Sequence, residues 1–247
     1  MSFCIRSNRT LKCGIMSVWF GLLSVVAGCQ YARLLQFKSQ LSQVSTNFRF
    51  EVNNSGPIIR CLRPVLEPVD VLLITQGTSP NVTALNQGKI TWQFIQKKQY
   101  SRAIPYEEAH PNLVITLQFN EKNRLESCVY PIQFTALFPS EMVSQLLSTI
   151  GTSKVGVQDR SLSSQQNWIR KEWLPTKQQI IQALGVPYEE IVSKNVTTLK
   201  YRYTIQQSEE PAQTWIVLRV RNSDEKVVFF SGTVFGPEMR CSFDHVQ

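Results

Sequence analysis

Residues 176–230 restrict the fold more strongly than any other part of the chain, because their pattern predicts one short helix followed by three strands. Thr176 and Gln179 have the spacing of a capping box, in which each side chain accepts a hydrogen bond from a backbone N–H of the first turn. Gly185 can adopt the left-handed conformation that ends a helix, and Pro187 prevents its continuation. A helix this short, with one apolar face, needs a sheet to pack on. The alternation of apolar and polar residues predicts strands at residues 200–205, 216–221 and 227–230.

The same order of elements occurs about 108 residues earlier in the chain. An apolar segment at residues 71–77 is followed by strand-like segments at residues 90–95, 114–119 and 125–130. A repeat of this length favours duplicated domains, because solenoid repeats are usually about 20 to 50 residues long. The sequence therefore predicts an α+β fold of two tandem two-layer units, each a short helix or helix pair packed on a three- to four-stranded antiparallel sheet.

Outside these two segments the sequence predicts a hairpin, a further helix and a linker. Residues 48–62 contain two strand patterns separated by a strong turn signal. Residues 139–150 are expected to form a helix with Ser140 as its cap and Gly151 as its stop. Residues 152–170 are rich in Ser, Gln and Gly, which is typical of a linker.

The N-terminus has the three parts of an export signal: positive charges at residues 6–12, an apolar run over residues 15–28 and a small-residue end. The last residues, Ala27, Gly28 and Cys29, resemble a bacterial lipobox, in which the cysteine becomes the lipidated first residue of the mature chain. The apolar run is short for a spanning helix, which needs about 20 residues. An uncleaved N-terminal anchor and an ordinary secretory signal are the alternatives.

The lipobox resemblance implies a location. Gln30 follows the cysteine, whereas enterobacterial lipoproteins kept at the inner membrane usually have Asp there, so the outer membrane is favoured, with the body facing the periplasm. Three acyl chains on Cys29 make attachment effectively permanent, since one chain gives only marginal binding. Loss of residues 1–28 lowers the formal net charge from +8 to +5. Outside the cytoplasm, a moderately basic chain is expected to meet membrane and envelope proteins, not nucleic acid.

These patterns divide the chain into a signal peptide, a tether, two repeats and the segment between the repeats. The tether fits either a short amphipathic helix or a loose connection. The expected boundaries are 1–28 for the lipoprotein signal peptide, 29–47 for the lipid-anchored tether, 48–138 for the first repeat, 139–173 for the helix and linker, and 174–247 for the second repeat.

Three cysteines remain in the mature body besides Cys29: Cys61, Cys128 and Cys241. In an oxidising periplasm they permit one disulfide and one free thiol, and the sequence does not choose among the three pairings. We favour Cys61 with Cys128, since both lie in the same half of the chain. Buried free cysteines are the alternative.

Four segments of the second repeat, at residues 176–180, 184–187, 201–203 and 218–228, together resemble the small outer-membrane assembly lipoproteins (SmpA/OmlA, BamE-like). Those proteins share a capped helix that ends in Leu-Gly-x-Pro, a Trp/Tyr-x-Tyr strand and a final hairpin. The same folding unit occurs in tandem in the β-lactamase inhibitor proteins. The match covers about 55 residues of this chain, and Leu174-Pro175 stand where the family's helix-entry motif usually has Gly. The resemblance implies a protein-binding role in cell-envelope assembly or maintenance, with a lipid-anchored inhibitor or scavenger of an envelope protein as the alternative.

Catalytic patterns are missing from the sequence. The two histidines, His110 and His245, lie in a Pro-rich loop and next to the end of the chain. Glu107 and Glu108 precede His110, but no second cluster has the spacing that would complete a metal site. There is no Gly-x-Ser-x-Gly, no phosphate-binding Gly-rich loop and no paired-Cys zinc spacing. We therefore expect no enzyme activity, cofactor or metal, and an envelope hydrolase is the least favoured alternative.

Two segments combine basic and aromatic residues. At residues 200–203, strand alternation directs the tyrosines to the core and Lys200 and Arg202 to water, with a glycan or nucleic-acid platform as the alternative. Arg170, Lys171 and Trp173 lie just before the second helix, where they are candidates for docking a partner or an anionic surface. Packing of this linker on its own domain is the alternative.

Overall fold

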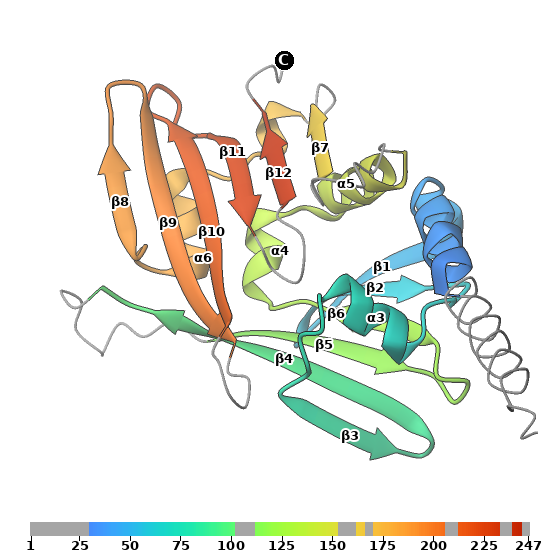
Figure 1. Cartoon of the computed structure of the whole chain (residues 1–247). Helices are drawn as coiled ribbons and strands as arrows, with labels where there is room; N and C mark the ends of the chain where they lie inside the picture. Colours follow the sequence, from blue (N-terminus) through green and yellow to red (C-terminus); the bar gives the residue numbers. More distant parts are fainter. Residues whose placement is uncertain are drawn as a thin grey trace, which may run out of the picture.

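The structure is a computed structural model that describes residues 30–101, 112–152, 162–165, 170–205, 212–232 and 239–243 (Figure 1). Residues 1–28, which were expected to be a signal peptide, Cys29 and both histidines lie outside these ranges, so the expectations for them stay predictions. No helix within the described ranges has the length and apolar composition needed to cross a membrane.

Twelve strands of the described chain form one sheet. Its path runs β1-β2-β6-β5-β4-β9-β10-β11-β12-β7, while β3 pairs with β4 and β8 pairs with β9. Every pairing is antiparallel except that of β12 with β7. The N-terminal half contributes β1 (Phe48–Asn53), β2 (Gly56–Cys61), β3 (Val82–Asn86), β4 (Lys89–Gln99), β5 (Leu113–Phe119) and β6 (Leu125–Val129). The C-terminal half contributes β7 (Leu162–Gln165), β8 (Glu189–Val192), β9 (Val196–Ile205), β10 (Ala212–Arg221), β11 (Val227–Gly232) and β12 (Met239–Ser242).

The prediction of two tandem units with separate small sheets is wrong, because β4 and β9 join both halves into one sheet. β3 covers the edge of β4 only as far as Gln93, and β8 covers the edge of β9 only as far as Lys200. The rest of each edge, Gln96 to Gln99 on β4 and Arg202 to Ile205 on β9, pairs with the other. Buried backbone groups without partners are costly. β4 and β9 extend past β3 and β8, and the backbone N–H and C=O groups of their uncovered ends therefore find hydrogen-bond partners in each other.

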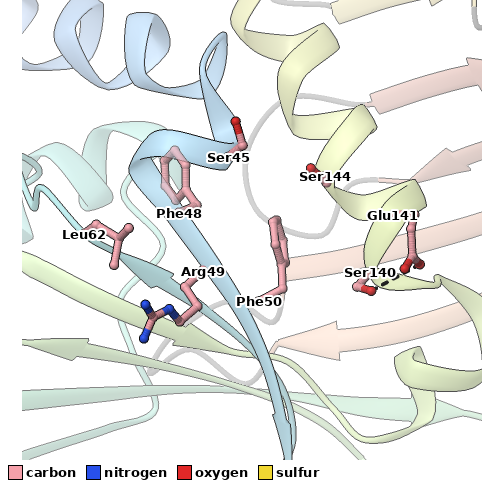
Figure 2. A pocket seen from close by; sticks show the side chains of 8 residues that line it. All are labelled: Ser45, Phe48, Arg49, Phe50, Leu62, Ser140, Glu141 and Ser144. Carbon is pink, nitrogen blue, oxygen red and sulfur yellow. Dashed lines mark hydrogen bonds between the residues drawn. The ribbon is translucent and has the colours of Figure 1, made fainter.

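The sheet ends at β1, which pairs only with β2 among the described strands. Two helices stand beside this end, α2 (Val44–Asn47) and α5 (Ser140–Thr152). Figure 2 shows an open cleft between β1 and the first turns of α5.

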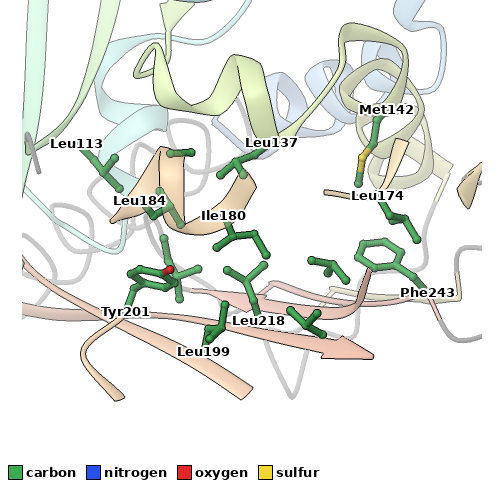
Figure 3. Close-up of a cluster of buried hydrophobic side chains, with 14 of the residues drawn as sticks. Leu113, Leu137, Met142, Leu174, Ile180, Leu184, Leu199, Tyr201, Leu218 and Phe243 are labelled. Atoms are coloured by element: carbon green, nitrogen blue, oxygen red, sulfur yellow. The ribbon is translucent and has the colours of Figure 1, made fainter. Parts of the chain in front are cut away.

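Helices α3 (Pro68–Ile74) and α6 (Lys177–Leu184) pack on the same face of the sheet. Because side chains alternate along a strand, Trp92, Phe94 and Lys98 of β4 share that face. The two aromatic rings pack with Val71 of α3, whereas Lys98 donates a hydrogen bond to the Leu184 carbonyl of α6. α4 (Gln133–Leu137) and α5 complete the core over the C-terminal strands (Figure 3).

The capped helix and the strands after it are confirmed. In α6 the Gln179 N–H donates to Thr176 Oγ1 at 3.2 Å, and the Thr176 N–H donates to Gln179 Oε1 at 2.8 Å. Gly185 ends the helix with a φ of 75°. Ile180 is completely buried against the sheet. The segments expected as strands at residues 200–205, 216–221 and 227–230 lie in β9, β10 and β11.

Gly151 has a different role from the one expected. α5 continues to Thr152, so the prediction that Gly151 stops the helix is wrong. A Cβ atom at position 151 would lie 2.1 Å from the backbone nitrogen of Ser42, and glycine therefore permits a close approach of two backbones. The expected linker 152–170 is also not a linker throughout, because it contains β7, which pairs with β12.

Residues 30–41 are helical, so the structure has the helix rather than the loose connection at this segment. Arg33 donates from Nε and Nη2 to the two carboxylate oxygens of Asp70 at 2.6 and 2.9 Å, and its guanidinium is 3.1 Å from Glu67. Glu67 also pairs with Arg124, at 3.0 Å. This network fastens the N-terminal helix to α3 and to the turn between β5 and β6.

Candidate functional site

Arg170, Lys171 and Trp173 make contacts within the chain. The Arg170 guanidinium lies 5.3 Å from the centre of the Trp173 ring, and Lys171 Nζ is 2.9 Å from a carboxylate oxygen of Asp224. The hydrogen bond from Lys171 lowers the pKa of the Asp224 carboxyl. Trp173 is partly buried against the core under α6. These contacts favour packing of the segment on its own domain, and a partner at these residues stays a prediction.

Cys61, Cys128 and Cys241 are free, partly buried thiols. Cys128 lies opposite Ile59, so it is a diagonal neighbour of Cys61 on one face of the sheet. The proposed Cys61–Cys128 disulfide is not formed here and stays a prediction. Burial raises the pKa of Cys61 and Cys128 to about 12 and that of Cys241 to about 11. Thiols that stay protonated at neutral pH are poor nucleophiles.

Lys98 is buried where the two halves of the sheet meet. Its ammonium group donates to the Leu184 carbonyl and lies 5.1 and 5.2 Å from the ring centres of Tyr100 and Tyr201. Burial lowers the pKa of Lys98 to about 8. A cation is favourable at the carboxyl end of a helix. We assign this lysine a structural role, because its ammonium group joins β4 to the carboxyl end of α6 and contacts two rings. Within the described residues no three His, Cys, Asp or Glu side chains are placed to hold a metal.

Replacing Lys98 with Met is expected to change how stability depends on pH. The unfolded chain keeps the lysine proton up to its ordinary pKa of 10.5, whereas the folded chain loses it near pH 8. Between these values the unfolded state binds more protons, so this group makes the free energy of unfolding rise with pH, by about 1–3 kcal/mol. Burial raises the pKa of Tyr201 and Tyr203, which acts in the opposite direction in both proteins.

The difference between wild type and Lys98→Met therefore isolates the lysine. Urea unfolding at about pH 7.5 and about pH 10 measures it, and we expect the wild type to gain stability relative to the variant at the higher pH. A difference that is the same at both pH values contradicts a buried lysine with a lowered pKa.

The face of β9 and β10 turned away from α6 carries no described helix. In Figure 1, α6 lies behind these two strands. Tyr201 and Tyr203 are buried in the core on the α6 side. Lys200 and Arg202 are half-exposed on the other side, which confirms the alternation expected from the sequence.

Arg202 lies beside two aromatic rings on this uncovered face. Its guanidinium carbon is 5.5 Å from the ring centres of both Tyr188 and Trp215. The two rings meet edge to face, with their centres 5.7 Å apart and an angle of 89° between their planes. Trp215 of β10 is directly opposite Arg202 of β9, and Tyr188 precedes β8. The guanidinium and the two rings therefore form a triangle, in which both rings attract the cation. Arg202 Nη1 also donates a hydrogen bond to the Tyr188 hydroxyl at 3.4 Å.

Two cations of this face, Arg202 and Arg219, have no carboxylate partner within the described residues. Arg202 forms no ion pair there, and its buried Nε has no hydrogen-bond partner. Arg219 of β10 lies 4.7 Å from the centre of the opposite Phe229 ring and also has no carboxylate partner in the described chain. Lys200, by contrast, pairs with Glu189 at 2.8 Å. We call this group the Arg202 surface; it consists of Tyr188, Arg202, Trp215, Arg219 and Phe229.

The sequence alone did not predict most of this surface. It placed Arg202 toward water but did not connect it with Trp215. The connection follows from the hairpin of β9 and β10, in which Trp215, like Arg219, shares a face with Arg202. No sequence pattern placed Tyr188 on this surface. It precedes β8, and the pairing of β8 with β9 brings it beside Arg202.

No protein-family model, curated protein or solved structure matches this chain. The BamE-like resemblance therefore stays a prediction. Function has to be inferred from the side chains themselves.

Proposed function

We propose that this chain is a lipid-anchored, non-enzymatic protein-binding module of the bacterial outer membrane, acting in cell-envelope assembly or maintenance through the Arg202 surface. The observation that carries the proposal is Arg202 held against Tyr188 and Trp215 with no carboxylate partner in the described chain. Arg, Trp and Tyr dominate the binding energy of protein interfaces. An acidic surface on a partner supplies the missing counter-charge, and the planar guanidinium can bind a carboxylate through two hydrogen bonds.

The N-terminal helix supports anchoring close to the membrane. Helical structure extends from residue 30, directly after Cys29, and Arg33 fastens this helix to Asp70. A lipid on Cys29 would therefore hold the folded body at the membrane surface without a long connection.

The Cys29→Ser variant is expected to lose acylation and to move from the membrane fraction to the soluble fraction. Three acyl chains hold a protein at a bilayer far more tightly than a moderately basic surface does. Cell fractionation with mass spectrometry of the N-terminus measures both effects, and Cys61→Ser is the matched control. A Cys29→Ser protein that fractionates like wild type contradicts the anchor.

Crosslinking in intact cells, followed by purification and mass spectrometry, tests the binding role. We expect the partner to be recovered with wild type and with Lys122→Gln, which removes an exposed charge from a distant turn, but not with Arg202→Gln. Equal recovery with Arg202→Gln contradicts the proposal. Barrel-assembly components among the recovered proteins support the assembly role, whereas a single envelope enzyme supports the inhibitor alternative.

A further inference from the structure

The outer edge of β1 offers unpaired backbone groups. β1 is the last strand of the sheet, and no described strand pairs with its outer edge. The Leu62 N–H donates to the Asn47 carbonyl at 2.8 Å, in the same register as the β1–β2 ladder. Residues that bond to the neighbouring strand alternate with residues that do not. The N–H and C=O groups of Phe50 and Val52 therefore point away from β2, toward the edge.

A cleft of about 470 Å³ runs beside this edge, between β1 and the first turns of α5 (Figure 2). The strand lines it with Phe48, Arg49 and Phe50, and the helix lines it with Ser140, Glu141 and Ser144. A free strand edge on one side and a helix on the other is an arrangement suited to binding an extended peptide, which adds to the sheet as a further strand.

Side chains around the edge define which peptide fits. Phe50 is half-buried on the α5 side, and Val52 follows on the same face with 61% of its surface exposed. Apolar residues directly opposite these two would extend the apolar cluster, because cross-strand neighbours on one face touch. Arg49 points to the other face, is exposed and forms no ion pair with a described residue. An acidic residue opposite it would neutralise this charge.

We propose that the β1 edge binds an extended segment of a partner protein, with apolar side chains at alternate positions facing Phe50 and Val52 and an acidic side chain facing Arg49. β1 spans about 20 Å, which sets the length of the segment at about six residues. The main chain of the segment bonds to the outward groups of β1, and α5 closes the cleft on the other side.

A second copy of this chain is a poorer occupant than a peptide. Strand pairing of two β1 edges would bring the α5 helices of both copies to the same narrow space, because α5 lines the cleft along β1. A lone strand brings no helix with it. The Arg202 surface is a separate site, since β9 is five strands along the sheet from β1, about 24 Å away.

Selection of random eight-residue peptides displayed on phage, against the full chain purified in detergent, tests the proposal. We expect enrichment of sequences with two apolar residues separated by one residue and an acidic residue beside them. With the enriched peptide labelled for fluorescence anisotropy, Val52→Pro should weaken binding at least tenfold, because proline removes an outward N–H and leaves the β2 ladder intact. Val52→Thr keeps that N–H and loses only part of the apolar contact, so it should bind several-fold more tightly than Val52→Pro, whereas Arg202→Gln should bind within twofold of wild type.

Two further variants keep the test decisive if Val52→Pro does not fold. Ser144→Trp fills the cleft from the helix side and should also weaken binding at least tenfold. Arg49→Glu should change the selected residue from acidic to basic. Absence of the expected pattern, or unchanged binding to the folded Val52→Pro or Ser144→Trp protein, overturns the proposal. A dimer that Val52→Pro dissociates also overturns it, because the occupant would then be a second copy. None of these results bears on the Arg202 surface, which Arg202→Gln tests separately.

Discussion

We expect the Asp70→Ala variant to lose about 3–5 kcal/mol of its free energy of unfolding. The Asp70 side chain is completely buried and accepts hydrogen bonds from Nε and Nη2 of Arg33 and from the backbone N–H of Glu67. The substitution removes the closest counter-charge of Arg33 and one half of the capping box of α3. Arg33 keeps its ion pair with Glu67 at 3.1 Å, so the loss comes from its two charge-assisted hydrogen bonds to a buried carboxylate and from the cap of α3. Urea unfolding of the purified variant measures the loss.

A half-exposed ion pair is the matched control for this experiment. Glu51 and Arg60 lie 3.1 Å apart on the hairpin of β1 and β2, and Glu51→Gln should leave the unfolding midpoint nearly unchanged because solvent screens such pairs. The double variant Arg33→Met with Asp70→Ala should lose less stability than the sum of the single variants. If Asp70→Ala unfolds at the wild-type midpoint, the N-terminal helix is not fastened to α3 as described.

The second large effect is expected on binding. Arg202→Met should weaken binding of the isolated partner by about 2–4 kcal/mol, which is about 30- to 1000-fold. The guanidinium is held by Tyr188 and Trp215 before binding, so little side-chain freedom is lost when a carboxylate binds. Surface plasmon resonance with purified partner measures the change.

Two comparisons identify the cause of that loss. Arg202→Lys keeps the charge but not the guanidinium that contacts both rings and donates to the Tyr188 hydroxyl, so we expect an affinity between those of wild type and Arg202→Met. Wild-type affinity should fall as salt concentration rises, and the Arg202→Met variant should depend less on salt. Arg202→Met with wild-type affinity contradicts the role of this surface.

Single helices and strands could be predicted from the sequence, because the residues that define each of them are neighbours in the chain. The capping box of Thr176 and Gln179 and the terminal Gly185 define α6 within one stretch of chain. Alternation in β9 correctly placed Tyr201 and Tyr203 in the core and Arg202 on the other face. These are statements about neighbours in sequence.

The joining of the two halves could not be predicted in the same way. It depends on how far β4 and β9 extend past β3 and β8, and strand lengths are poorly defined by polarity patterns. The role of Gly151 also depends on a distant segment of the chain. A glycine near a helix end is typical of a helix stop, whereas here it allows the backbone of Ser42 to approach. The Arg202 surface likewise needs the register of β9 with β10, which brings Trp215 to the arginine.

Site-specific photocrosslinking from Gln213 in living cells tests the central claim most directly. Gln213 is exposed on β10, two residues from Trp215 on the same face of the sheet, so a photoreactive residue there lies beside any protein bound to the Arg202 surface. We expect one dominant crosslinked partner from position 213, its loss when Arg202→Met is introduced as well, and no such product from position 122. Crosslinking from position 213 that is absent, or that persists unchanged with Arg202→Met, would contradict the account.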